Sequence, residues 1–337
     1  MTSKPIVSVV VIGRNEGARL NRCLTSIQES DMAAGSLELI YVDSASTDDS
    51  LYQASTFDAQ TILISDGKPC AARGRNAGWQ AATAPFVLFL DGDTILHPEF
   101  IKTALDTMRT ESGVAVVWGH RREIAPEQSI YVRVLDLDWM YPPGDSEFCG
   151  GDALFRRSVL VRTGGFNDTL IAGEEPELCN RLRELGYKIS HIDAAMTQHD
   201  LAITSFPPYW KRAFRAGYAY AQIAEQCRYM THPLWSKEVK HHFVRGSLLA
   251  IAPILLIALS LTVPIALAFF ALLAMFVLAR TMHQCKWKSP HFWTRFSYAV
   301  HSHFQHLPIV LGQIDFYRHQ FLGRERGLIE YKQEQTK

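Results

Sequence analysis

Asp91 and Asp93 are the residues whose types and spacing most clearly suggest chemistry. They follow the apolar run Phe86 to Leu90, with a single glycine between them. Two carboxylates this close repel each other unless a cation lies beside them. Oxygen ligands of this kind suit Mg²⁺ or Mn²⁺, and such an ion can bridge the oxygens of a diphosphate. Taken alone, an Asp-x-Asp triplet is more often a solvated turn, so its meaning depends on the elements that position it.

The amino-terminal half of the chain alternates short β-branched runs with stretches of helical spacing. The runs typical of strands are residues 6–12, 38–42, 61–64, 86–90 and 114–118. This alternation predicts an α/β domain with a mostly parallel sheet and helices on both faces. Ligands of such sheets bind beyond the carboxyl ends of the strands. We therefore expect Arg14 to Glu16, Asp43 and the segment Arg73 to Asn76 to converge with the two aspartates.

The order and spacing of these residues resemble those of the family 2 glycosyltransferases, which have the GT-A fold. The resemblance spans roughly residues 6–186 and rests on Val9 to Glu16, Tyr41 to Asp48, Gly74 to Gly78, Phe89 to Asp93, and Gly164 through Gly173 to Arg183. It implies a Rossmann-like, mostly parallel sheet with flanking helices. It also implies an enzyme with a nucleotide-sugar donor, uridine being the expected base, and a divalent Mn²⁺ or Mg²⁺ ion.

The resemblance also implies roles for individual residues. Asp43 is expected to contact the base or the ribose, and Arg73 or Arg75 the nucleotide. Asp91 and Asp93 are expected to contact the ribose, the metal and the diphosphate. The predicted donor site as a whole comprises Asn15, Glu16, Asp43, Arg73, Arg75, Asp91 and Asp93.

A histidine is a further candidate for the metal site. Members of this family often place a histidine after the strand that here includes Tyr187 to Ile192, and His199 follows that run. We expect His199 to contact the metal or the diphosphate together with Asp91 and Asp93. A histidine held by a hydrogen bond in the core is the equal alternative.

The segment Gly173-Glu174-Glu175-Pro176 supplies the candidate base. Pro176 is typical of the first residue of a helix, and carboxylates just before it would lie at the positive end, which keeps them ionised. Displacement of a nucleoside diphosphate needs a base that takes the proton of the acceptor hydroxyl. The family usually has aspartate at the position of Glu175, so Glu175 is the predicted base and Glu174 the alternative. Without the resemblance, both would be interpreted as helix caps.

A long uncharged segment predicts contact with a membrane. Gly246 to Ala279 is 34 residues long and contains no charged residue. As one helix it would be about 51 Å long, against a hydrocarbon core of roughly 30 Å. We therefore expect a break at Ser260 to Pro264 and two spans, at residues 243–261 and 263–279. Flanking lysines and arginines favour a cytoplasmic location for both ends. A buried hairpin in a soluble core and a re-entrant hairpin are the alternatives.

The carboxyl-terminal tail predicts a second kind of membrane contact. Thr281 to Lys337 contains eight Lys or Arg residues, four Asp or Glu residues, and many aromatic residues. This composition indicates an amphipathic helix in the plane of the interface, from about His291 to Phe321, with a bend at Pro308. Single-stranded nucleic acid is the less favoured partner, because the neighbouring hairpin indicates lipid. The formal net charge of zero also argues against a nucleic-acid-binding protein.

An aromatic and basic stretch precedes the hairpin. Trp210, Arg212 and Arg215 are candidates for contact with an acceptor phosphate or with the membrane surface, and the basic face of an interface helix is the alternative. The predicted organisation is a GT-A domain at 1–230, a juxtamembrane linker at 231–242, a transmembrane or re-entrant hairpin at 243–280, and an interface tail at 281–337. The six scattered cysteines form no Cys-x-x-Cys pair, which favours a reducing compartment.

Three functions are compatible with these features. The first is an inverting, metal-dependent, non-processive enzyme that transfers one sugar to a lipid-linked acceptor in polysaccharide or glycolipid synthesis. It would lie at the cell inner membrane with its catalytic domain in the cytoplasm. The second is a polyprenyl-phosphate sugar synthase, and the third is a silent membrane scaffold that binds nucleotide. The sequence determines neither the sugar nor the oligomeric state.

Overall fold

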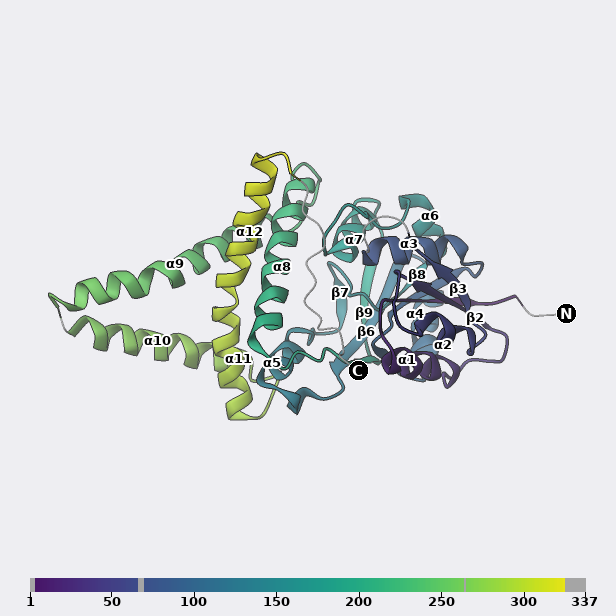
Figure 1. The fold of residues 1–337 in the computed structure, drawn as a ribbon, viewed down its shortest axis with the longest axis horizontal. Helices are drawn as coiled ribbons and strands as arrows, with labels where there is room; N and C mark the ends of the chain where they lie inside the picture. The colour runs from purple at the N-terminus through teal and green to yellow at the C-terminus, as the bar shows by residue number, and fades with distance from the viewer. Residues whose placement is uncertain (1–3, 66–69, 264, 325–337) are drawn as a thin grey trace.

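The structure is a computed structural model that describes residues 4–65, 70–263 and 265–324. Figure 1 shows three parts: a domain built around a sheet, a layer of upright helices, and a helical hairpin that projects away from the sheet. The sheet has nine strands in the order β3-β2-β1-β4-β8-β6-β9-β5, and β7 pairs with β9. Its strands are β1 Val7–Gly13, β2 Leu37–Asp43, β3 Gln60–Leu63, β4 Phe86–Asp91, β5 Thr94–Leu96, β6 Val114–Glu123, β7 Gly144–Ser146, β8 Ala153–Arg156 and β9 Lys188–His199.

The sheet confirms the predicted α/β class but is more mixed than expected. Strands β3, β2, β1 and β4 are parallel to one another, and β6 is parallel to β9. Strand β8 runs antiparallel between β4 and β6, and β5 and β7 pair antiparallel with β9. Strands β5, β7 and β8 were not predicted, because runs of three or four residues carry no clear periodicity. Strands β6 and β9 extend five and seven residues beyond the predicted ends at 118 and 192, and these extensions contribute to the site.

Helices flank this sheet. The helices of the amino-terminal domain are α1 Ala18–Gln28, α2 Ser50–Ser55, α3 Ala71–Ala81, α4 Phe100–Thr110, α5 Ile130–Asp138, α6 Arg157–Thr163 and α7 Glu174–Glu184, with a 3₁₀ turn at Pro126–Gln128. Helix α3 lies close to β1 because Gly78 has no side chain. A Cβ on Gly78 would lie 2.1 Å from Cγ1 of Val10. This close approach sets the height of α3, and hence of Arg75, above the sheet.

The remaining helices are α8 Phe206–Gln226, α9 Ser236–Ser260, α10 Ile265–Gln284, α11 Phe292–Phe304 and α12 His306–Phe321. Three glycines let them pack closely. A Cβ on Gly217 of α8 would lie 2.0 Å from the carbonyl oxygen of Ile309, and one on Gly312 of α12 would lie 2.0 Å from that of Phe214. Gly246 of α9 similarly faces the carbonyl oxygen of His306, at 2.5 Å. The hairpin is thus joined to the body through backbone contacts among α8, α9 and α12.

The hairpin itself is apolar and exposed. Helices α9 and α10 are each long and apolar enough to cross a membrane, and only 6% of the most apolar 18-residue window of each is buried. The alternative of a hairpin buried in a soluble core is therefore wrong for this structure. Helix α9 ends at Ser260 and α10 begins at Ile265, which agrees with the two expected spans. Pro264, part of the predicted break, lies outside the described residues.

Two boundary predictions need correction. The predicted linker at 231–242 is helical from Ser236 onward, since α9 starts there. The predicted single helix with a bend at Pro308 is two helices, α11 and α12, that meet at Gln305. Pro308 lies in the first turn of α12, where its missing N–H removes no intrahelical hydrogen bond. Ile309, Gly312 and Phe316 of α12 are buried, so this helix packs on protein rather than lying wholly in an interface.

Candidate active site

The carboxyl ends of β1, β2 and β4 bring the predicted residues to one edge of the sheet. In the strand register, Gly13 at the end of β1 pairs with Asp43 on β2, and Ile12 pairs with Asp91 on β4. Asp43 and Asp91 therefore lie on either side of β1, one residue apart in register. The register confirms that Asp43 and Asp91 come together at this edge of the sheet.

Asp43 and Asn15 hold two loops of this edge together. The buried carboxylate of Asp43 accepts hydrogen bonds from Tyr41 Oη at 2.9 Å and from the backbone N–H of Ser46 at 2.7 Å. The Asn15 side chain accepts from the N–H of Thr47 at 2.7 Å, and the Asn15 N–H donates to Ser46 Oγ at 2.9 Å. Glu16 forms an ion pair of 3.0 Å with Arg19. These residues shape the loops next to the predicted donor site, and their contact with a nucleotide stays a prediction.

Arg75 is the centre of the charged cluster. Its side chain is 3% exposed and lies 2.9 Å from Oδ1 of Asp91. The same guanidinium reaches Glu174 at 2.8 Å and Glu175 at 3.0 Å. Burial lowers the pKa of Arg75, but the surrounding carboxylates raise it well above its usual value, so this cation is permanent. Arg75 therefore joins the Asp-x-Asp strand end to the candidate base.

Gly151 makes room for this contact. A Cβ at position 151 would lie 2.6 Å from Nη2 of Arg75 and 2.9 Å from Oδ2 of Asp91. The next residue, Asp152, is fully buried and accepts the N–H of Asp91 at 3.0 Å and the hydroxyl of Thr197 at 2.8 Å. Glycine at 151 and aspartate at 152 thus set the position of Asp91.

Asp93 belongs to a second cluster, with His199. Nε2 of His199 lies 3.2 Å from Oδ2 of Asp93, and its Nδ1 lies 2.7 Å from Oε1 of Glu123. Burial and the charge of Arg121 lower the pKa of His199. The two carboxylates outweigh both effects and raise the pKa to about 9.

Sequence reasoning missed three residues of these clusters: Arg121, Glu123 and Asp152. Arg121 and Glu123 occupy the part of β6 beyond the predicted strand end, and both are buried. The guanidinium of Arg121 stacks 4.5 Å from the ring of Trp139 and raises the positive potential around Asp152, Asp91 and Asp93. Residues 121 and 123 lie on the buried face of β6, but the sequence did not show this, because charged residues in a strand are normally assigned to its exposed face.

The candidate base lies at the start of α7. This helix begins at Glu174 and follows Gly173 (φ 83°), so Pro176 is its third residue and not, as predicted, its first. Burial and the charge of Glu174 raise the pKa of Glu175 to about 7, although Arg75 lowers it. Burial and the charge of Glu174 thus oppose the expected effect of the helix end, which was to keep this carboxylate ionised. A carboxylate with this pKa can accept and release a proton near neutral pH.

The residues present fit a divalent ion in part. Within the described ranges, no group of three or more His, Cys, Asp or Glu is assembled as a metal centre. Asp93 and His199 nevertheless combine a carboxylate with an imidazole whose other nitrogen faces Glu123, an arrangement typical of metal-binding histidines. With its pKa raised to about 9, His199 would have to lose a proton to bind the ion. Asp91 is held by Arg75 instead. The donor set suits an ion that completes its coordination with diphosphate oxygens.

The other predicted contact residues lie elsewhere. The ring of Trp210 packs 5.9 Å from that of Phe304, and Arg215 donates to the carbonyl of Ile171 at 2.9 Å. Arg212 lies on the same helix, α8. Burial raises the pKa of Asp138, but His301 and, to a smaller extent, Arg212 lower it below its usual value. Arg73 lies in the first turn of α3, where its N–H donates to Sγ of Cys70. None of these observations tests a role in acceptor, nucleotide or membrane binding.

Comparisons with known proteins place this site in a family. The family described as "Glycosyl transferase family 2" matches residues 8–163, and "Glycosyl transferase family group 2" matches residues 86–282. Glycosyltransferase AglE of Haloferax volcanii is 25% identical over 233 residues, which cover 66% of this chain and 76% of AglE. The O-antigen chain rhamnosyltransferase WbaN of Salmonella anatum is 26% identical over 210 residues, covering 58% of this chain and 66% of WbaN.

A solved structure shares the fold over almost the whole chain. The mannosyltransferase PcManGT of Pyrobaculum calidifontis, in complex with GDP-Man and Mn²⁺, superposes with a TM-score of 0.66 at 20% identity. The superposition covers 94% of this chain and 88% of PcManGT. The match at residues 86–282 covers more than half of the 337 residues. The protein therefore belongs to the family 2 glycosyltransferases and is a glycosyltransferase with the GT-A fold.

Proposed function

We propose that the protein transfers a single sugar from a nucleotide-sugar to a hydroxyl group of a membrane-held acceptor, with inversion at the anomeric carbon. The observation that carries this proposal is the bridge through Arg75, which lies 2.9 Å from Asp91 and 3.0 Å from Glu175. The bridge puts a candidate base beside the strand end that the family uses for the donor. Both halves of a displacement reaction can thus meet at one place.

The step itself is a single displacement. Glu175 takes the proton of the acceptor hydroxyl, the hydroxyl oxygen bonds to the anomeric carbon, and the bond to the diphosphate breaks. Its pKa of about 7 makes it both sufficiently ionised and sufficiently basic. Glu174 is buried and accepts from Arg75 at 2.8 Å, which suits a positioning role. One displacement with one base inverts the configuration.

The developing charge on the diphosphate needs nearby cations. Asp93 and His199 would hold a divalent ion, which when bound supplies positive charge to the leaving diphosphate. Arg121 and Arg75 are buried protein cations in the same region, and neither can lose its charge near neutral pH. They hold the carboxylates in place when nucleotide is absent.

The hairpin supports a membrane-held acceptor. Helices α9 and α10 expose apolar side chains along their length, and the lysines and arginines at the ends next to the body favour a cytoplasmic catalytic domain. Confining enzyme and acceptor to one surface raises their encounter rate. WbaN, one of the relatives, is named for transfer to an O-antigen chain, which is consistent with a role in glycan assembly.

A donor screen tests the proposal. The full chain in detergent is incubated with each common nucleotide-sugar, with Mn²⁺ and with membrane lipid extract, and release of nucleoside diphosphate is measured. We expect release with one donor class, dependent on the extract, and loss of release in Glu175→Gln. Retained activity in Glu175→Gln with polyprenyl phosphate would favour a polyprenyl-phosphate sugar synthase, because a phosphate nucleophile needs no base. A nucleotide that binds without turnover of any donor would favour the silent scaffold.

A further inference from the structure

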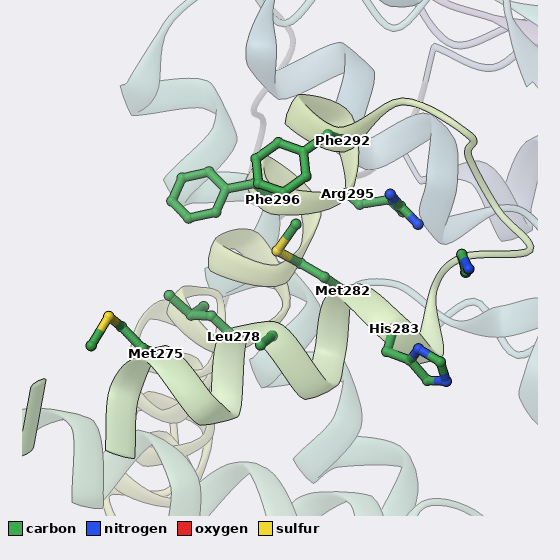
Figure 2. A pocket seen from close by; sticks show the side chains of 9 residues that line it. Met275, Leu278, Met282, His283, Phe292, Arg295 and Phe296 are labelled. Atoms are coloured by element: carbon green, nitrogen blue, oxygen red, sulfur yellow. The ribbon is translucent and has the colours of Figure 1, made fainter. Parts of the chain in front are cut away.

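A cavity of about 420 Å³ lies between α10 and α11. Figure 2 shows Met275 and Leu278 toward one end of it, Phe292 and Phe296 above, and the nitrogen-bearing side chains of Arg295 and His283 toward the other end. Its size is that of a typical small-molecule pocket. None of the lining residues belongs to the active-site clusters.

Two cations of this cavity have no acidic partner among the described residues. Lys286 and Arg295 both line it, and no carboxylate of the described chain forms an ion pair with either. The Nε of Arg295 is buried and has no hydrogen-bond partner among the described residues. A cationic end beside an apolar end is complementary to a molecule with an anionic head and a hydrocarbon tail.

The location of the cavity fits the surface of a bilayer. It lies at the end of α10, the second candidate span, where the helix leaves its apolar segment at Arg280. Trp287 and Trp293 are close in sequence to the residues that line the cavity, and their exposed fractions are 57% and 71%. Tryptophan is enriched at the level of lipid headgroups, where the cations of the cavity would also lie.

Helix α11 separates this cavity from the catalytic domain. On its other face, His301 lies 3.0 Å from Asp138, the last residue of α5, and 2.7 Å from Oη of Tyr209. At 100° per residue, His301 is about half a turn away from Phe292, which lines the cavity. A lipid in the cavity would therefore not face the displacement reaction, which argues against an acceptor lipid as the occupant.

We propose that this cavity binds one anionic phospholipid. The guanidinium of Arg295 and the ammonium of Lys286 take the phosphate, since arginine matches phosphate oxygens with two parallel hydrogen bonds. One acyl chain lies against the methionine, leucine and phenylalanine side chains, and methionine adapts to a mobile chain. The bound lipid joins α10 to α11 and so fixes the catalytic domain relative to the bilayer. This inference rests on the proposed membrane location.

Lipid binding to the full chain tests the proposal. Detergent-solubilised protein is titrated with phosphatidylglycerol or phosphatidylcholine, and bound lipid is measured by native mass spectrometry. We expect one phosphatidylglycerol to bind preferentially. Lys286→Gln with Arg295→Gln should weaken its binding about 30-fold, since each cation near a lipid headgroup contributes about fivefold. Ala279→Trp should weaken the binding of both lipids, because Ala279 lines the cavity and is exposed.

The matched control is Lys240→Gln with Arg280→Gln, which removes the same charge near the hairpin from exposed residues that do not line the cavity. Unchanged binding in this control supports a specific site. An equal loss in both double variants would show a diffuse charge effect and overturn the proposal. If Lys286→Gln with Arg295→Gln raised the KM for the acceptor but left phosphatidylglycerol binding unchanged, the cavity would be an acceptor site, and the proposal would be overturned as well. Specific lipid binding by a chain that transfers no sugar would support this site and contradict the proposed function.

Discussion

The active site buries charged groups inside the protein, whereas the hairpin exposes apolar groups on its surface. In the active site, Asp93 and His199 are buried and Asp91 is half-buried, and buried cations or carboxylates lie beside each. In the hairpin, leucines, isoleucines and phenylalanines of α9 and α10 are exposed along both helices. Buried charges are tolerated only with partners, and exposed apolar surface of this extent indicates a partner or a lipid phase. The contrast shows that contacts within the protein stabilise the charged groups of the active site, whereas the surroundings of the hairpin must stabilise its apolar surface.

Loss of the base should have the largest effect on the catalytic side of this contrast. Glu175→Gln should lower kcat by about 10²- to 10⁴-fold without unfolding the protein, because general base catalysis is worth that much. The measurement is nucleoside diphosphate release under saturating donor. Glu174→Gln is the control and should lose less. A larger loss in Glu174→Gln than in Glu175→Gln would assign the base to Glu174.

Removal of the shared cation should destabilise the buried cluster. Arg75→Gln leaves Asp91, Glu174 and Glu175 without their common partner, and breaking such a buried pair costs about 3–5 kcal/mol. Thermal unfolding in detergent should show a lowered Tm, and Arg75→Lys should recover part of it. The control is Arg109→Gln, whose partner Asp106 is 3.5 Å away at an exposed site. Equal Tm values for the Arg75 and Arg109 variants would refute the role of Arg75 as a structural bridge.

A side chain at the helix crossing should loosen the hairpin while sparing the sheet. Gly312→Val would place atoms against the carbonyl of Phe214, where a Cβ already comes within 2.0 Å. Overpacking of this kind costs about 1–3 kcal/mol. Limited proteolysis between α8 and α9 should become faster. Gly113→Ala is the control, since a Cβ there meets no atom within 4 Å. Unchanged cleavage of the Gly312 variant would mean that close backbone contact does not hold the hairpin.

The pH dependence of the active site should give the smallest effect. Only the ionised form of Glu175 takes a proton, and burial beside Glu174 raises its pKa to about 7. The kcat/KM should therefore fall about fivefold between pH 7 and pH 6 and level off above about pH 8. Residual activity in Glu175→Gln should lack this transition. A midpoint near pH 4.5 in the wild type would show that the carboxylate is solvated during the reaction.

Local patterns predicted the elements better than their contacts. The apolar runs placed the ends of β1, β2, β3 and β4 within one residue, because a strand in a parallel sheet leaves a continuous apolar signal. The fifth run matched the start of β6 but ended five residues too early. Pro176 was predicted to be the first residue of a helix and Pro308 to mark a bend. Each is instead the third residue of its helix, since proline is accepted anywhere in the first turn. Arg121, Glu123 and Asp152 carried no signal of function, because nothing along the chain shows which buried charges meet.

The sequence by itself determined the family, the sheet edge at which Asp43 and Asp91 lie, and the presence of two long apolar segments. These features follow from runs of neighbouring residues, whose period and length decide strand, helix and span. Only the tertiary structure decided that Arg75 joins Asp91 to Glu175, that Glu175 has a raised pKa, and that three glycines hold the hairpin. Those properties depend on atoms that are close in space and distant in the chain, where burial and charge act over a few ångströms.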